Sequence, residues 1–245
     1  MIDEISEFIN YKNELIKIYS KTIKFGEINI KLSNIKENDH IFNHFTIYKG
    51  KGVFYENTLL EKIKSLKLNG TYIDCGANIG NHSVYFLNFT KCNSLVSIEG
   101  HDKIFDVLKF NINNNNHYNK KNNLINSLIG DKIDDTYYIN LEDDNNCGVG
   151  YVNKEKGINK KMITIDSLVL NNVSLIKLDV ENYEYQVLLG SIETIKKYRP
   201  VIVIELHETN PFYNEIIKFL KKYDYETDGI NYAKTPTFIY TQILK

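Results

Sequence analysis

The spacing of apolar residues changes near Gly70. Beyond that point, short apolar segments alternate with segments whose apolar residues recur every three or four positions. The expected strands cover residues 72–75, 95–98, 124–129, 175–178 and 201–206, and the expected helices cover 83–89, 103–113, 183–198 and 212–222. This alternation predicts an α/β fold: a doubly wound, mostly parallel sheet with helices on both faces.

The segment before Gly70 has a mixed pattern. Residues 5–19 carry apolar positions at helical spacing, which predicts a helix that either covers the core or binds a partner. Residues 22–32 alternate apolar and polar, as in a strand or hairpin, and a second short strand is expected over 42–48. A helix over 59–66, stopped at Asn69-Gly70, follows. We therefore expect an N-terminal helix and β-hairpin extension over 1–50, through which a homo-oligomer could form, and one domain over 51–245.

Two further segments depart from the alternation. Residues 131–165 read as an antiparallel excursion with a polar loop over 142–150. The asparagine-rich residues 111–123 read as a solvated helix end and loop without chemistry.

The most informative segment joins a strand to a helix through a glycine turn. It reads Tyr72-Ile73-Asp74-Cys75-Gly76-Ala77-Asn78-Ile79-Gly80. In a doubly wound sheet this turn lies at the carboxyl end of the first strand, where such folds bind ligands. Glycines let the backbone approach a ligand closely, and the following helix offers unpaired N–H groups.

Two acidic residues bear on the choice of ligand. The turn lacks the G-x-G-x-x-G pattern of dinucleotide sites, which disfavours a nicotinamide oxidoreductase. Asp74 before the turn would repel a pyrophosphate and favour a ligand with a sulfonium, such as S-adenosyl-L-methionine. Glu99 ends the second strand, where an acid can accept hydrogen bonds from ribose hydroxyls.

Three ordered segments resemble the FkbM-type S-adenosylmethionine-dependent methyltransferases. The glycine turn resembles that family's D-x-G-A-N-x-G motif. The segments Lys177-Leu178-Asp179-Val180-Glu181-Asn182-Tyr183-Glu184 and Arg199-Pro200-Val201-Ile202-Val203-Ile204-Glu205 resemble its K-x-D-V-E-G-x-E and R-P-x-x-x-x-E motifs. The resemblance covers residues 52–207. Asn182 departs from the pattern, since the family has glycine there; asparagine tolerates left-handed backbone angles better than most residues.

The resemblance implies a Rossmann-like methyltransferase that binds S-adenosyl-L-methionine. The loop would be shaped by Gly76, Ala77, Asn78 and Gly80, and Asp74 would face the methionine end.

Five more residues complete the expected cofactor site. Glu99 would hold the ribose, and Ser127, at the end of the third strand, would pass the adenine. Asn81 and Ser83 would cap the following helix or contact the cofactor carboxylate. Glu56 resembles a family glutamate that reaches the cofactor, or is a solvated acid at a helix start.

The expected catalytic residues lie at later strand ends. Asp179 would open onto the methyl-transfer site and border the cofactor, and Glu181 follows it closely. His207, with Glu205, could supply a base near neutral pH. Glu181 could instead cap the next helix, and His207 could be structural.

Composition and charge narrow the class of protein. The chain has 245 residues, 42% of them hydrophobic, with 30 Lys and Arg against 31 Asp and Glu. This balance, with Arg199 as the sole arginine, disfavours nucleic-acid binding.

No apolar run reaches the ~20 residues of a membrane span, and the acidic start differs from a secretory signal. Three cysteines without a C-x-x-C pair indicate reduced thiols, hence a cytoplasmic protein. His40 and His44 have i, i+4 spacing, but no metal site is expected.

These observations lead to an expected function. We expect an O-methyltransferase that acts on a sugar hydroxyl, as a nucleotide sugar or glycan, or on another small molecule. An RNA or protein methyltransferase is the nearest alternative. A cofactor-binding module without turnover is the alternative from a different class.

Overall fold

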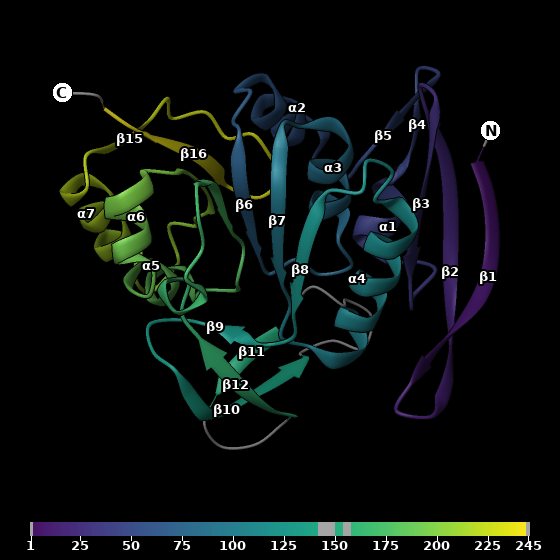
Figure 1. Cartoon of the computed structure of the whole chain (residues 1–245), viewed down its shortest axis with the longest axis horizontal. Helices are drawn as coiled ribbons and strands as arrows, with labels where there is room; N and C mark the ends of the chain where they lie inside the picture. The colour runs from purple at the N-terminus through teal and green to yellow at the C-terminus, as the bar shows by residue number, and fades with distance from the viewer. Residues whose placement is uncertain (1, 142–149, 154–157, 244–245) are drawn as a thin grey trace.

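The computed structural model describes residues 2–141, 150–153 and 158–243. A seven-stranded sheet forms its centre, in the order β15-β16-β14-β13-β6-β7-β8 (Figure 1). These strands are β6 (Gly70–Cys75), β7 (Cys92–Ile98), β8 (Lys121–Ile125), β13 (Val173–Leu178), β14 (Val201–Glu205), β15 (Tyr225–Thr227) and β16 (Thr237–Gln242). The pairs between β14 and β8 are parallel, and β16 and β15 add antiparallel pairs at one edge. The predicted mostly parallel sheet is confirmed.

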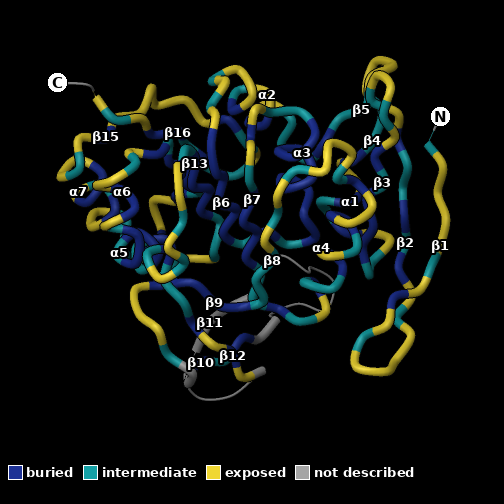
Figure 2. Tube along the Cα trace, in the orientation of Figure 1, coloured by how far each residue is buried: buried dark blue, intermediate teal, exposed yellow. Residues whose placement is uncertain are grey.

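Helices cover both faces of this sheet, because alternate side chains of each strand enter two separate cores. Tyr72 packs with α2 (Asn57–Ser65), α3 (Asn81–Phe89) and α4 (Asp102–Asn115), whereas Ile73 packs on the other face. The helices on that face are α5 (Glu184–Leu189), α6 (Ile192–Tyr198) and α7 (Tyr213–Lys222). Figure 2 shows β6 buried along its length, whereas β8, at the edge of the sheet, is half-buried or exposed.

The single helix predicted over 183–198 is two helices, α5 and α6. Gly190 ends α5 where the chain passes very close to another backbone segment. A Cβ at Gly190 would lie 1.9 Å from the carbonyl oxygen of Gly130, so no larger residue fits there. A short 3-10 helix, Asp166–Leu168, lies close by: its Asp166 carboxylate accepts the N–H groups of Glu193 and Thr194.

The helix predicted over residues 5–19 is wrong: the extension is a β-sheet. Its strands are β1 (Ile2–Tyr11), β2 (Glu14–Phe25) and β3 (Ile28–Asn34), followed by α1 (His40–His44), β4 (Thr46–Tyr48) and β5 (Lys51–Val53). Lys12 and Asn13 have φ of 49° and 70° and reverse the chain in the middle of the apparent helical stripe. Apolar residues on two antiparallel strands thus imitated a helical period, and Ile9 faces Ile16 across the hairpin.

The rest of the extension follows the prediction in part. A strand or hairpin is predicted over 22–32, and the β2–β3 hairpin occupies this region. A strand is predicted over 42–48, but only β4 is extended there. The first part of this range belongs to α1, which Asp39 caps by accepting the N–H of Phe42.

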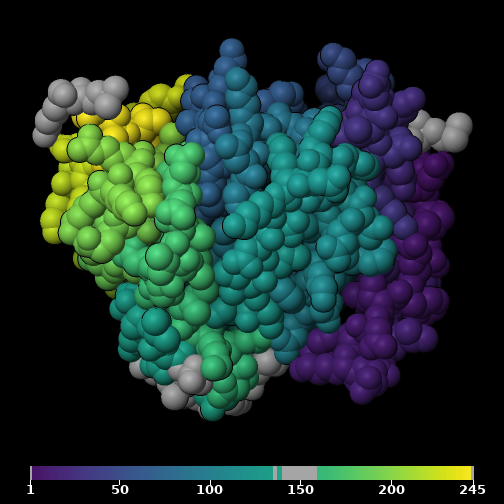
Figure 3. All heavy atoms as spheres, in the orientation of Figure 1, coloured from purple at the N-terminus to yellow at the C-terminus, as the bar shows by residue number. Residues whose placement is uncertain are grey.

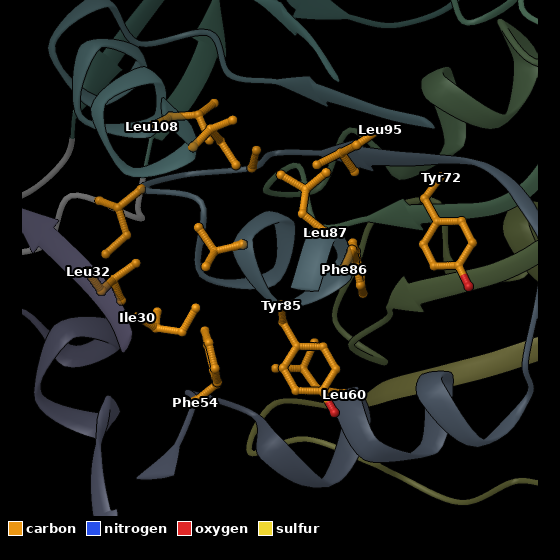
Figure 4. Close-up of a cluster of buried hydrophobic side chains, with 14 of the residues drawn as sticks. Ile30, Leu32, Phe54, Leu60, Tyr72, Tyr85, Phe86, Leu87, Leu95 and Leu108 are labelled. Carbon is orange, nitrogen blue, oxygen red and sulfur yellow. The ribbon is translucent and has the colours of Figure 1, made fainter. Parts of the chain in front are cut away.

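The extension and the α/β sheet share one core. Ile30 and Leu32 of β3 are fully buried in the same cluster as Leu108 of α4 and Phe54 (Figure 4). Figure 3 shows the purple strands of the extension lying against the teal segment that contains α4. The extension is therefore packed onto this segment by apolar burial, the main favourable term in folding.

Two asparagines of α4 pair with the backbone of β3. Asn111 accepts the N–H of Ser33 at 2.8 Å and donates to its carbonyl oxygen at 2.9 Å, and Asn115 makes the same pair of bonds with Lys31. Asn111 also donates to the carbonyl oxygen of Ile79 in the glycine turn, at 2.7 Å. Both side chains are fully buried and seal a strand edge, which the sequence did not indicate. Most of the remaining stretch is solvated as predicted, with Asn113, Asn114 and Asn119 exposed.

The predicted antiparallel excursion is present in the described residues. Here β10 (Asp134–Leu141) pairs with β11 (Gly150–Asn153) and β12 (Ile158–Ile163) antiparallel, and β12 pairs with β9 (Leu128–Ile129) parallel. The strand predicted over 124–129 is thus divided between β8 and β9. Most of the predicted polar loop, 142–149, lies outside the described residues. In Figure 1 the excursion lies below β7 and β8.

Replacing Asn111 by Ala should destabilise the fold. The change leaves buried backbone groups of Ser33 and Ile79 without partners, at a cost of about 2–4 kcal/mol. Urea denaturation followed by circular dichroism measures this, with Asn113→Ala, at an exposed position of the same helix, as the matched control. Equal unfolding midpoints for both variants would contradict the assigned role.

Candidate functional site

A cavity of about 590 Å³ opens at the carboxyl ends of the central strands. Its walls come from the glycine turn after β6, the ends of β7, β13 and β14, the excursion, α1 and the segment before β16. Strand ends of open α/β sheets are where such folds bind ligands, and the volume suits a small molecule.

The glycine turn approaches the neighbouring strand end closely. Gly76 has a φ of 74°, and a Cβ there would lie 1.8 Å from the carbonyl oxygen of Asp179. Gly80 has a φ of 90°, precedes α3 and packs against Leu108, but does not line the cavity. Ala77 and Asn78 do line it. The turn is therefore fixed in shape before any ligand binds.

Glu99 lines the cavity and holds the glycine turn. Its carboxylate accepts the N–H of Asn78 at 3.0 Å and the N–H of His101 at 2.8 Å. Burial raises the pKa of Glu99, although these two hydrogen bonds lower it. Each oxygen keeps acceptor capacity for a hydroxyl in the cavity.

Asp74 lies beneath the turn, away from the cavity. Its side chain is fully buried, Ser83 Oγ donates to Oδ2 at 2.6 Å, and Lys177 Nζ lies 3.3 Å from Oδ1. The carboxylate therefore faces an ammonium of this chain, whereas the sequence suggested that it faces the methionine end of the cofactor. Ser83 bonds Asp74 and does not line the cavity.

Lys177 connects the turn to the end of β13. Its Nζ lies 3.1 Å from Asp179 Oδ2 and donates to the carbonyl oxygen of Gly76 at 3.4 Å, in addition to its contact with Asp74. Burial disfavours the charged ammonium, but the nearby carboxylates, led by Asp179 and Asp74, raise the pKa of Lys177. A buried lysine thus stays charged because two carboxylates surround it.

Asp179 and Glu205 form a carboxyl pair at the ends of β13 and β14. Burial and the neighbouring Asp179 charge raise the pKa of Glu205 to about 8. Burial also acts on Asp179, but Lys177 outweighs it and the pKa of Asp179 is lowered. His207 Nε2 lies 3.2 Å from Glu205 Oε1, and the His207 side chain is 47% exposed. Near neutral pH the pair therefore holds one proton, on Glu205.

Glu181 and Asn182 form the turn after β13. Their φ values are 52° and 68°, so asparagine adopts the left-handed geometry for which the family has glycine. Glu181 lines the cavity. At this turn it is Glu184 that accepts the N–H of Val180, at 3.1 Å, and the Asn210 amide, at 2.9 Å.

Glu56 and Asn81 also line the cavity. Asn81 exchanges two hydrogen bonds with the backbone of Tyr55, which ties this segment to α3. Glu56 is a left-handed residue at the start of α2 and its Oε2 lies 3.1 Å from His82 Nε2, with both side chains nearly buried. Glu56 is thus a buried partner of a histidine, whereas sequence reasoning left a solvated acid as an alternative.

Ser127 lines the cavity beside the excursion. Its Oγ donates to the carbonyl oxygens of Lys161, at 2.7 Å, and Leu128, at 3.0 Å. The hydroxyl therefore fixes the path of the chain at this wall.

Sequence reasoning missed Tyr55 and His82, and assigned no role to Lys177, although all three line the cavity. Lys177 had a readable signal, since a lysine inside an apolar strand must find buried partners. Tyr55 had none, because its position depends on long-range contacts.

Within the described ranges, no group of three or more His, Cys, Asp or Glu is arranged to hold a metal. His44 Nδ1 instead lies 2.8 Å from the carbonyl oxygen of His40. Likewise, none of the helices in these ranges combines the length and apolar character needed to cross a membrane.

The parallel sheet, the glycine turn after β6, Glu99 at the end of β7 and the carboxyl pair together have the architecture of a Rossmann-like methyltransferase. Residues 74–227 match the family model described as "Methyltransferase FkbM domain". The chain belongs to the FkbM methyltransferase family. This membership places it among the methyltransferases that use S-adenosyl-L-methionine.

A solved structure supports the fold. A methyltransferase FkbM from Methylobacillus flagellatus KT matches with a TM-score of 0.53 and 17% identity, covering 71% of this chain. This chain spans only 44% of that protein. The precorrin-6y C5,15-methyltransferase of Geobacter metallireducens GS-15 matches with a TM-score of 0.48 and 13% identity, covering 82% and 94% of the two chains. The tRNA m1G37 methyltransferase of M. jannaschii matches with a TM-score of 0.44 and 14% identity, covering 92% and 55%. No curated protein matches the chain.

Replacing Gly76 by Ala should abolish tight cofactor binding. The added Cβ would force the turn away from Asp179. A displacement of this kind should lower the affinity for the cofactor about 100-fold. Calorimetric titration with S-adenosylhomocysteine measures the loss. Gly26→Ala is the matched control, since Gly26 also has a positive φ, 61°, but no atom lies within 4 Å of the added Cβ. Equal affinities would show that the turn is not the binding element.

Replacing Glu205 by Gln should make the protein relatively more stable as pH rises. Folding raises the pKa of Glu205 from its usual 4.5 to about 8. Between these values the unfolded chain releases the proton while the folded chain retains it, so wild-type stability falls. Glutamine cannot ionise, so the melting temperature of the variant relative to wild type should rise by a few degrees between pH 5 and pH 8. The control is His207→Gln. A difference that does not change with pH would contradict the shared proton.

Proposed function

We propose that this protein transfers the methyl group of S-adenosyl-L-methionine to a hydroxyl group of a sugar, in a nucleotide sugar or a glycan. The observation that carries the proposal is the Asp179–Glu205 pair, which lies in the same cavity as the glycine turn and Glu99. A cofactor subsite and a group able to take a proton thus share one enclosed space.

The transfer needs alignment and one proton acceptor. The bound cofactor supplies an electrophilic methyl group; its C–S bond breaks as the acceptor oxygen forms the new C–O bond. The acceptor proton passes to the carboxyl pair, with Glu205 or Asp179 as the accepting group, and His207 can carry it to solvent. Alignment can supply ~7–11 kcal/mol of barrier lowering, and a positioned base about 10²–10⁴-fold in rate. Glu181, in the same cavity, would orient the hydroxyl.

The cofactor would lie across the ends of β6, β7 and β13. Glu99 would hold the ribose, and Ser127 and Leu128 would border the adenine. Gly76, Ala77 and Asn78 would form the turn against the methionine portion, with Glu56, Asn81 and Asp179 around its amino-acid end. Asp74, Gly80 and Ser83 support this site from below, because none of them lines the cavity.

A sugar acceptor agrees with the near-neutral charge of the chain, which has one arginine and no excess of basic residues. An RNA acceptor would need phosphate contacts from basic residues.

The same proposal keeps residues 51–245 as the methyltransferase domain, residues 1–50 as an extension through which copies could associate, and a cytoplasmic location. That location agrees with two free, buried cysteines, Cys75 and Cys92.

Methyl-release assays over a panel of sugars, nucleotide sugars, RNA and protein test the function. Glu205→Gln and His207→Ala should lower kcat about 10²-fold and leave S-adenosylhomocysteine affinity within about twofold, because both groups lie on the acceptor side. Wild-type kcat should rise with pH as Glu205 loses its proton near pH 8. Glu99→Ala should instead weaken S-adenosylhomocysteine binding about tenfold, through lost hydrogen bonds. Cofactor binding without transfer to any acceptor would favour a module without turnover.

A further inference from the structure

One end of the cavity is built by parts of the chain that the family model does not cover. Tyr55 and His40 precede the matched residues 74–227, and Lys234 to Pro236 follow them. In the strand order this end lies at β14 and β16, whereas Glu99 and Ser127 lie at β7 and β8. The matched domain thus supplies the end with Glu99 and Ser127, and segments outside the matched residues contribute to the other end.

The geometry ties these segments to the carboxyl pair. Glu205 is the partner of Thr237 in the β14–β16 ladder, and Leu206 N–H donates to the carbonyl oxygen of Pro236 at 2.7 Å. The segment 234–236 is therefore held directly beside Glu205. Tyr55 is also held in place, because Asn81 makes two hydrogen bonds with its backbone.

Three rings pack together at this end of the cavity, and two of them, Tyr55 and His40, line it. The centroids of Tyr55 and His40 lie 5.1 Å apart, and His44 packs behind at 4.2 Å from His40 and 5.7 Å from Tyr55. Burial lowers the pKa of His40, and the neighbouring His44 and Lys234 lower it further against the opposing effect of Asp39 and Glu56, which favours the neutral ring. This wall offers ring surface and hydrogen bonds without charge, which suits the ring of a sugar.

Lys234 supplies a positive charge at this end of the cavity. It is exposed, lines the cavity, and makes no ion pair with any of the described residues. Lys177, the other lysine of the cavity, is already occupied by Asp74 and Asp179. A lysine at a cavity mouth without a carboxylate of its own is available to an anionic group.

We propose that Tyr55, His40 and Lys234 form the acceptor subsite, and that the acceptor is a sugar carrying a negative charge, which Lys234 binds. The proposal rests on the methyltransferase function proposed above. It adds the substrate class, and it locates specificity outside the shared domain. With its anionic group at Lys234 and its ring against Tyr55, the acceptor would bring a hydroxyl to Glu205.

The test measures binding to the protein saturated with S-adenosylhomocysteine. Calorimetry with UDP-glucose, glucose 1-phosphate, glucuronate and methyl glucoside separates a phosphate from a carboxylate as the source of the charge, with methyl glucoside as the neutral reference. At least one anionic probe should bind more than about tenfold tighter than methyl glucoside, and Lys234→Gln should remove this difference, as loss of a charged hydrogen bond predicts. Lys222→Gln, on α7 and outside the cavity lining, is the matched control.

Three results would overturn the subsite. One is equal binding of neutral and anionic probes, including no binding of either. Another is a Lys234→Gln protein that keeps the preference for the anionic probe. The third is a Lys234→Gln protein with weakened S-adenosylhomocysteine binding, since Lys234 would then hold the cofactor carboxylate. Failure of the proposed function is distinguishable, because wild-type protein would then transfer no methyl group to any acceptor of the assay panel, whichever probes it binds.

Discussion

The site depends on one buried ammonium. Lys177 connects two segments that are distant in sequence: the glycine turn, through Asp74 beneath it and the carbonyl oxygen of Gly76, and the end of β13, through Asp179. Removing one partner of a buried ion pair is costly, because the remaining charge stays out of water. Lys177 therefore sets the distance between the glycine turn and the end of β13, where Asp179 lies. It also accounts for the buried Asp74, whose charge is neutralised within the protein.

Lys177 also separates the behaviour of two neighbouring carboxyl groups. Asp179 touches the ammonium and stays ionised, while Glu205, one strand further, retains its proton beyond neutral pH. Pairs of titratable groups whose environments push their pKa values apart are the usual basis of acid–base assignments in enzymes. The Lys177 ammonium thus both holds the glycine turn in place and lowers the pKa of Asp179 relative to that of Glu205.

The five parallel strands of the central sheet and the helices between them were readable from the sequence, because buried parallel strands and glycine turns leave strong local signals. The antiparallel strands β15 and β16 were not predicted, and neither was α1, which lines part of the cavity. Residues 5–19 were misread as a helix, since two strands joined at Lys12–Asn13 imitated a helical period. The partners of Asp74 could not be read, because the choice between Lys177 and a ligand is made by packing over long sequence distances. The buried positions of Asn111 and Asn115 depend on β3, which lies far away in the chain.

The Asn111 carboxamide bonds both the backbone of β3 and the carbonyl oxygen of Ile79. A single side chain thus couples a peripheral strand to the peptide that precedes Gly80. Thermodynamic linkage is reciprocal, so if cofactor binding restrains that peptide, it must also protect the β3 amides from hydrogen exchange. Conversely, any contact that rigidifies the three-stranded sheet strengthens cofactor affinity by the same factor. The sheet that contributes no group to the reaction is in this way placed to modulate it.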